Sequence, residues 1–79
     1  MSRPREHARA LLARALGIGL EGVRDAAAIG TQERWDSLAH MCLVLELEAA
    51  LGRPLATDEL LEISSLDGIA RVLAPKPAP

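Results

Sequence analysis

Ser37 is the residue of this chain whose type and setting could most directly do chemistry. It follows Asp36, just where a strongly helical run begins. Asp36 is a good N-cap, because its carboxylate can accept hydrogen bonds from the free amides of a first helical turn. The Ser37 hydroxyl would then face solvent at the first helical position, where unpaired backbone N–H groups and the helix dipole favour a negative charge. The chemistry that suits this position is the attachment of a phosphate ester.

His40 follows Ser37 by three residues, so the two side chains would be neighbours on a helix. A nucleophilic serine with a histidine base is one interpretation. Against it, so short a chain offers no room for a pocket, no third residue obviously orients the imidazole, and a shared helix face rarely gives the required geometry. We therefore expect His40 to be solvated, or in weak contact with whatever is attached to Ser37.

Cys42 is the one cysteine, which excludes an internal disulfide and a cysteine-cluster metal site. A reactive thiol needs a nearby cation or a helix N-terminus to favour the thiolate, and the sequence gives Cys42 no convincing one. We expect it to be a small apolar filler. No spacing of His, Cys, Asp and Glu matches a metal site, and no glycine-rich phosphate loop follows a strand.

The length of 79 residues indicates one small domain, with a thin core that buries roughly 60% of the surface of the unfolded chain. The chain has no Phe, no Tyr and one Trp, so its core must come from Leu, Ile, Val and Ala, a composition that favours helix. We expect the domain to span residues 1–74. The proline-rich segment 75–79 cannot continue a helix and is expected to fray.

The net charge of −2 is unevenly distributed, since residues 1–35 carry +2 and residues 36–79 carry −4. The acidic half holds Ser37, which argues against a nucleic-acid surface there and for partners with basic patches. No apolar segment follows the N-terminal arginines, and no run approaches membrane-spanning length. We expect a soluble, cytoplasmic chain that binds neither nucleic acid nor membrane.

The elements that position these residues are predicted to be helical. Apolar residues at helical spacing predict a first helix over residues 3–16, ended by Gly17. Residues 17–36 form a long connection whose composition is not that of a flexible linker. We expect a helical turn near residues 25–28 and an ordered loop pinned to the core by its apolar residues, Ile18, Leu20, Val23 and Ile29.

A second long helix is predicted over residues 37–51, with Gly52 as its stop. Leu43, Leu47 and Leu51 form a ridge suited to the core. A second face of the same helix is also mostly apolar, and so small a chain has little material to bury both. We expect this second face to stay partly exposed for a partner; it consists of Leu38, Met41, Val44, Leu45 and Glu48.

Two shorter elements complete the chain. Thr57 is a suitable N-cap before first-turn acids and predicts a helix over residues 58–62. Ser64 then opens an approximate capping box with Asp67, ahead of the last apolar stripe. Gly68 lies off that stripe, where glycine costs a helix about 1 kcal/mol relative to alanine. Together with the exposed apolar face, four acids of this half indicate a docking surface for a partner protein: Glu48, Asp58, Glu59 and Glu62. On such a surface the charges orient the approaching partner, and the apolar side chains supply the contact that holds it.

Asp36-Ser37-Leu38 resembles the attachment motif of acyl carrier proteins, small helical domains that carry acyl groups as thioesters on a 4′-phosphopantetheine arm. The likeness covers about the first 74 residues. The motif opens a helix at the midpoint of the chain, and the leucine ridge, Gly52, Leu55, the short acidic helix and Ile63-Ser64-Ser65-Leu66 follow in the family's order and spacing. The resemblance implies an all-α four-helix bundle with three main helices, one short helix and a long first loop.

The resemblance also implies that Ser37 is the phosphopantetheine attachment site and that the chain is not itself an enzyme. A separate phosphopantetheinyl transferase would activate the hydroxyl and deliver the arm from coenzyme A. Asp36 would help at that step, as a cap and through contact with the metal of the transferase. The exposed face would meet an acyl- or aminoacyl-loading ligase and downstream acyl-processing enzymes, with the chain acting as a monomer.

Two features depart from the family's pattern. Trp35 replaces the glycine that is usual before Asp-Ser-Leu, with Arg34 ahead of it, and Met41-Cys42 stands where acids often cluster. The chain is also far less acidic than carriers of fatty-acid synthesis. These features favour a discrete carrier of a specialised pathway, such as polyketide, amino-acyl or modified-lipid assembly.

Two other hypotheses stand beside the carrier. The first is a helical protein-interaction module with no prosthetic group, in which Ser37 is merely a cap. The second is a small helical DNA-binding domain. It needs basic residues on a recognition helix, and the best candidate helix, residues 37–51, has none.

Overall fold

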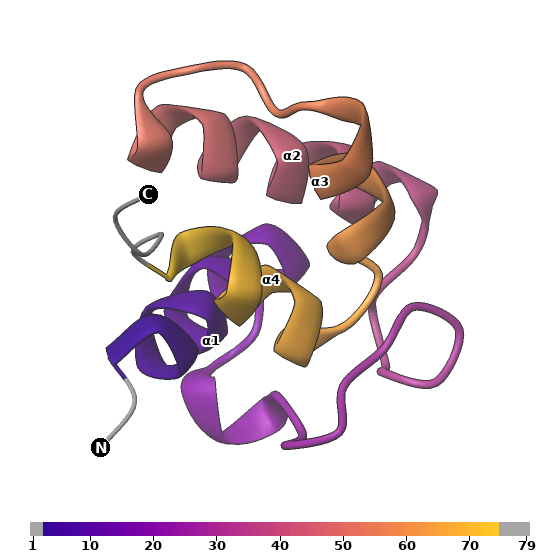
Figure 1. The fold of residues 1–79 in the computed structure, drawn as a ribbon. Helices are drawn as coiled ribbons and strands as arrows, with labels where there is room; N and C mark the ends of the chain where they lie inside the picture. The colour runs from indigo at the N-terminus through magenta and orange to yellow at the C-terminus, as the bar shows by residue number, and fades with distance from the viewer. Residues whose placement is uncertain (1–2, 75–79) are drawn as a thin grey trace.

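The computed structural model describes residues 3–74, which form four α-helices and one short 3₁₀ helix (Figure 1). The expected fraying of residues 75–79 lies outside the described range. The helices α1, α2, α3 and α4 are joined by a long first connection and two short ones. Within residues 3–74 no strand forms, and no helix is both long and apolar enough to cross a bilayer.

Helix α1 spans Arg3–Leu16, as its apolar periodicity predicts. Its inner face packs against both α2 (Ser37–Leu51) and α4 (Leu66–Leu73), so α1 is the element that the others share. In Figure 1, α1 and α4 lie side by side while α2 crosses above them. The centre of the core is filled by large side chains that are fully buried, from these three helices and the turn before α4: Leu12, Leu43, Leu47, Ile63, Leu66 and Ile69.

The bounds of α2 are those that the sequence predicts. At its start, the Asp36 Oδ1 accepts a hydrogen bond from the Ala39 amide at 2.8 Å. At its end, Gly52 adopts the left-handed conformation, with φ of 71°, and its amide donates to the carbonyl of Glu48 at 2.8 Å. Leu43 and Leu47 are fully buried, and Leu51 packs at the edge of the core. Capping at both ends therefore sets the helix that presents Ser37.

The long connection, residues 17–36, is ordered, but only part of its predicted anchoring is correct. Val23 is buried and Ile18 packs against the core, whereas Leu20 and Ile29 are exposed. Ala27 and Trp35 are buried in their place. The helical turn is the 3₁₀ helix η1, Leu20–Gly22, rather than residues 25–28, where a single turn closes from the Ala27 amide to the Arg24 carbonyl.

Polar contacts hold this connection where apolar residues do not. The buried Gln32 amide donates to the Gly22 carbonyl, and its oxygen accepts from the Arg24 amide, both at 3.0 Å. An isolated bridge pairs Ala28 with Ser65, so the connection is also tied to the start of α4. The loop is thus ordered through hydrogen bonds that apolar patterning does not reveal.

The two short helices begin at residues other than those predicted. Helix α3 spans Thr57–Glu62, one residue longer than predicted, and the residue that precedes it is Ala56. The N-cap of α4 is Ser65 rather than Ser64, since the Ser65 Oγ accepts from the Gly68 amide at 3.0 Å.

Gly68 has a structural role that its place in the apolar pattern does not reveal. It is buried, and a Cβ added there would lie 1.6 Å from the carbonyl oxygen of Glu62. Only glycine allows the end of α3 to approach the first turn of α4 so closely.

Candidate functional site

Ser37 is exposed at the first position of α2, where the sequence analysis predicts it. Its hydroxyl makes no hydrogen bond to any of residues 3–74. Asp36 is also exposed, and one of its carboxylate oxygens is held by the Ala39 amide. The hydroxyl can therefore be reached from outside, at a helix end whose dipole favours a negatively charged substituent.

Trp35 and His40 form a pair behind this helix start. The buried Trp35 donates its indole N–H to Nδ1 of His40 at 3.0 Å, and the two rings lie with their centroids 6.0 Å apart. His40 is half-buried, so the prediction that it is solvated is wrong. A residue does orient the imidazole, contrary to expectation. Since Nδ1 accepts, a neutral His40 ring carries its proton on Nε2.

The backbone bends sharply just before this pair. Arg34 has a φ of 72°, in the left-handed region that non-glycine residues rarely adopt. Arg34 forms no ion pair with a carboxylate of residues 3–74. Its side chain helps to line a hollow of about 200 Å³ beside Ser37, between the end of α1 and the start of α2. The lining residues are Ala15, Leu16, Arg34, Asp36, Leu38, Ala39 and Cys42.

The second face of α2 is exposed over three large apolar side chains. Leu38, Met41 and Leu45 keep 71%, 66% and 65% of their surface accessible. Val44 packs partly against the core. Glu48 is half-buried, and its carboxylate accepts from the Leu55 amide at 3.1 Å. The exposed part of this face is therefore narrower than predicted, and we call Leu38, Met41 and Leu45 the apolar patch.

Cys42 is exposed beside the apolar patch. The prediction that it fills the core is therefore wrong. Helical spacing alone does not decide whether Cys42 is buried or exposed, because Cys42 lies at the border between the buried ridge and the outer face of α2.

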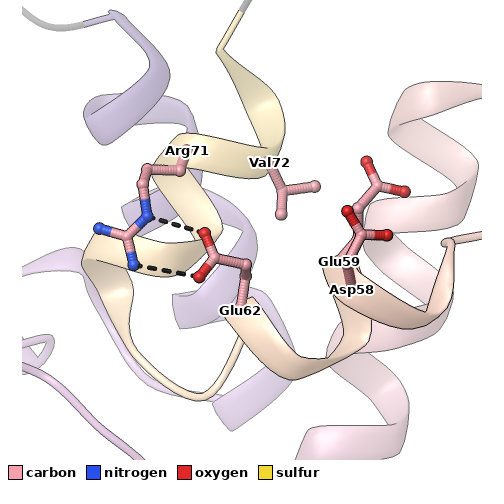
Figure 2. A pocket seen from close by; sticks show the side chains of 5 residues that line it. All are labelled: Asp58, Glu59, Glu62, Arg71 and Val72. Carbon is pink, nitrogen blue, oxygen red and sulfur yellow. Dashed lines mark hydrogen bonds and ion pairs between the residues drawn. The ribbon is translucent and has the colours of Figure 1, made fainter.

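The acids of α3 are in three different situations, shown in Figure 2 around a hollow of about 160 Å³ between α3 and α4. Asp58 is exposed. Glu62 pairs with Arg71 at 2.8 Å, and this hydrogen bond, with the charge of Arg71, lowers the pKa of Glu62. Glu59 is buried, so we leave it out of the surface that a partner could contact.

Glu59 instead stabilises the connection before α3. Its two carboxylate oxygens accept from the Arg53 guanidinium at 2.8 and 2.7 Å, and one also accepts from the Ala56 amide at 2.8 Å. The hydrogen bonds that Arg53 donates to Glu59 raise the pKa of Arg53 above its ordinary value. This carboxylate is the structural cap of α3, which explains why an acid is buried there.

Two exposed leucines of α3, Leu60 and Leu61, were not predicted. The available signal was the spacing of Glu59 and Ile63, which lie four apart and are both buried. Once these two face inward, the leucines between them must point outward.

The described residues contain no group of three or more His, Cys, Asp or Glu side chains that could hold a metal ion. The one histidine near Ser37 has its Nδ1 engaged by Trp35. The chain matches no protein-family model, and no curated protein matches it.

Proposed function

We propose that this chain is an acyl carrier protein, modified on Ser37 by 4′-phosphopantetheine. The single observation that supports the proposal most is the exposed hydroxyl of Ser37 at the capped start of α2, free of hydrogen bonds to the described residues. A serine that served only as a cap would have its oxygen turned onto a backbone amide, and here Asp36 fills that role.

The modification needs no base from this chain. In the reaction, a bond forms between the Ser37 oxygen and the phosphorus next to the pantetheine of coenzyme A. The bond from that phosphorus to adenosine 3′,5′-bisphosphate breaks, and the transferase takes the hydroxyl proton. The arm, when bound, supplies a terminal thiol that holds acyl or aminoacyl groups as thioesters.

The residues around Ser37 fit such a group. The backbone amides of the first turn and the helix dipole favour the negative charge of a phosphodiester. Asp36 holds one of those amides and keeps the helix start in place. Trp35 is buried behind the helix start, so the bulk that replaces the family's usual glycine does not obstruct the hydroxyl.

The apolar patch is the proposed contact surface for partner enzymes. Leu38, Met41 and Leu45 lie at i, i+3 and i+7 on α2, beginning next to Ser37. Asp58 and Glu62 add exposed acids on α3 that can meet a basic partner surface. The proposed partners are the transferase, an acyl- or aminoacyl-loading ligase and downstream acyl-processing enzymes. Weak docking with a tethered cargo raises the local concentration of that cargo at each enzyme.

The helix order supports the same proposal. Three longer helices, one short helix before the last, and a long first connection are the arrangement that the resemblance implies. We propose on this basis that the bundle is of the carrier-protein type. Its departures from the family's pattern, Trp35 and the weakly acidic composition, favour a specialised pathway.

The test is incubation of the chain with coenzyme A and a broad-specificity phosphopantetheinyl transferase, followed by intact mass measurement. The wild type should gain one phosphopantetheine. Ser37→Ala should gain none, whereas Ser64→Ala, which alters another exposed serine, should gain it as the wild type does. A wild-type chain that gains no mass contradicts the proposal.

One observation favours a second candidate, a helical protein-interaction module without a prosthetic group. The three exposed side chains of the apolar patch would serve any protein partner. In that case Ser37→Ala would leave partner binding unchanged, and the mass measurement would show no modification.

A further inference from the structure

Most arginines of the described chain pair with a carboxylate, but Arg3 and Arg34 pair with none in residues 3–74. Arg3 is the first residue of α1. Arg34 lies three residues before Ser37, so it places an unpaired positive charge next to the proposed attachment site. The arginines that do pair are Arg5, Arg9, Arg14, Arg24, Arg53 and Arg71.

The guanidinium of Arg34 is accessible and unengaged. Its side chain is exposed and donates no hydrogen bond to any described residue. A Cβ added at Gly17 would lie 3.9 Å from its Nη2, so the side chain extends toward the end of α1. It lines the hollow of about 200 Å³ together with Asp36 and Leu38, the residues on either side of Ser37. Its N–H groups are therefore available to an anion beside Ser37.

Arg34 and Ser37 are close enough along the chain for their side chains to meet. Three residues of fully extended chain span at most about 11 Å, which is the upper limit for the distance between their Cα atoms. The left-handed backbone at Arg34 is not extended, so the actual separation is shorter than this limit. The long arginine side chain and a phosphate carried on the Ser37 oxygen can both reach into this span.

Glycine would be the less costly residue at position 34. The φ of 72° at Arg34 brings a side chain close to its own backbone, a conformation that glycine adopts freely. The fold gains no ion pair or hydrogen bond within residues 3–74 from the Arg34 side chain in return. A residue held in a costly backbone conformation without such a contact points to a role in function.

A phosphate on Ser37 would place a second negative charge next to that of Asp36. Helix α2 has no charged side chain from Ser37 to Leu45 if His40 is neutral, so it supplies no cation to offset the repulsion. Arg34 is positioned to do so. Because the phosphate would be held covalently a few residues away, pairing with Arg34 would be intramolecular, which raises its effective concentration.

We propose that Arg34 binds the phosphate carried by Ser37, through hydrogen bonds from its guanidinium to the non-bridging phosphate oxygens. This inference rests on the proposed function. The planar guanidinium presents its donors in a geometry that matches phosphate. The ion pair offsets the repulsion between the phosphate and Asp36, and so preserves the cap of α2 once the group is attached. The contact is confined to the phosphate and is the same whatever the cargo.

Urea unfolding of the chain before and after loading measures this ion pair. Coenzyme A and a broad-specificity transferase supply the group, and intact mass confirms the loading of each variant. Loading should raise the ratio of folded to unfolded chain about threefold more in the wild type than in Arg34→Gln, as expected for an exposed ion pair. Arg34→Lys keeps the charge and should retain most of this difference. High salt should reduce it.

The matched control is Arg3→Gln, which removes an exposed arginine that also lacks a described carboxylate partner, at the start of α1. It should respond to loading as the wild type does. An equal response in Arg34→Gln and the wild type overturns the ion pair but leaves the carrier proposal intact. An equal loss in Arg3→Gln and Arg34→Gln also overturns it, because the effect would then be one of net charge.

The rate of loading separates the phosphate from the surface of the transferase. If Arg34→Gln slows loading but leaves the stability response unchanged, Arg34 contacts the transferase, and the proposed ion pair is overturned. A wild-type chain that gains no phosphopantetheine mass overturns both this proposal and the carrier function.

Discussion

Gly68→Ala is expected to destabilise the protein strongly, although the local helix preference predicts the opposite. In an ordinary helix, alanine is more favourable than glycine by about 1 kcal/mol. In this structure, the added Cβ would lie 1.6 Å from the Glu62 carbonyl oxygen and 2.7 Å from its carbon. Both are backbone atoms at the end of α3, so no side-chain rotation can relieve the contact.

The size of the effect follows from the displacement required. Cβ contacts under 3.0 Å are essentially never found, so the Glu62 oxygen must retreat by about 1.4 Å. That shift displaces the end of α3 next to Ile63 and Leu66, which are both fully buried. Forcing extra atoms into a packed site costs about 1–3 kcal/mol in cores, and a clash with backbone lies at the upper end. After the gain in helix preference, we expect a net loss of about 2 kcal/mol, from a total stability on the order of 4–12 kcal/mol for a chain of this size.

Urea unfolding followed by far-ultraviolet circular dichroism would measure the change. Gly52→Ala is the matched control, because Gly52 has a φ of 71° but nothing within 4 Å of an added Cβ. It should lose only the cost of the left-handed conformation, about 1 kcal/mol. If Gly68→Ala proved as stable as the wild type or more stable, the close approach of α3 to α4 would be refuted.

Three further predictions address other contacts. His40→Leu should lose about 1–2 kcal/mol of unfolding free energy, because it leaves the buried indole N–H of Trp35 without an acceptor. His40→Gln should lose less. Equal losses would contradict the hydrogen bond between Trp35 and His40. Arg71 lowers the pKa of Glu62, so this pair contributes stability that is present above the unfolded pKa of Glu62 and is lost as pH falls through its folded pKa. Arg71→Gln should therefore flatten the fall in urea midpoint between about pH 5 and pH 3. An unaltered slope would count against a stabilising pair. Met41→Lys should change the free energy of unfolding by less than about 0.5 kcal/mol, since Met41 is exposed. It should slow phosphopantetheine transfer several-fold in a kinetic mass assay. An unchanged rate would remove Met41 from the docking surface.

The helices could be predicted because their signals are local. The apolar spacing in α1 and the caps of α2, Asp36 and Gly52, are set by residues within a few positions of each other. Ser37 was placed correctly for the same reason. Local patterns are sufficient where a helix has both a buried face and recognisable ends.

The errors concern contacts between segments distant in sequence. Gly68 lies in the first turn of α4, off its apolar stripe, where helix preference alone would favour alanine. Glycine is required there because the end of α3 approaches the backbone closely. Glu59 looked like a surface acid, and its burial depends on Arg53 and the Ala56 amide in the preceding connection. His40 was expected in solvent because nothing in the pattern shows that Trp35 turns inward to meet it.

The long connection shows the same limit in another form. Apolar character alone predicted that Leu20 and Ile29 would be anchors, yet both are exposed. The buried Gln32 orders the loop through its two hydrogen bonds to backbone groups. Polar anchors of this kind leave no periodic signal in the sequence.

The most direct test of the central claim is tandem mass spectrometry of the protein isolated from its native cell. The carrier proposal predicts a phosphopantetheine group, free or acylated, on the peptide that contains Ser37 and on no other serine. A chain that is entirely unmodified in the cell, or modified only elsewhere, would contradict it.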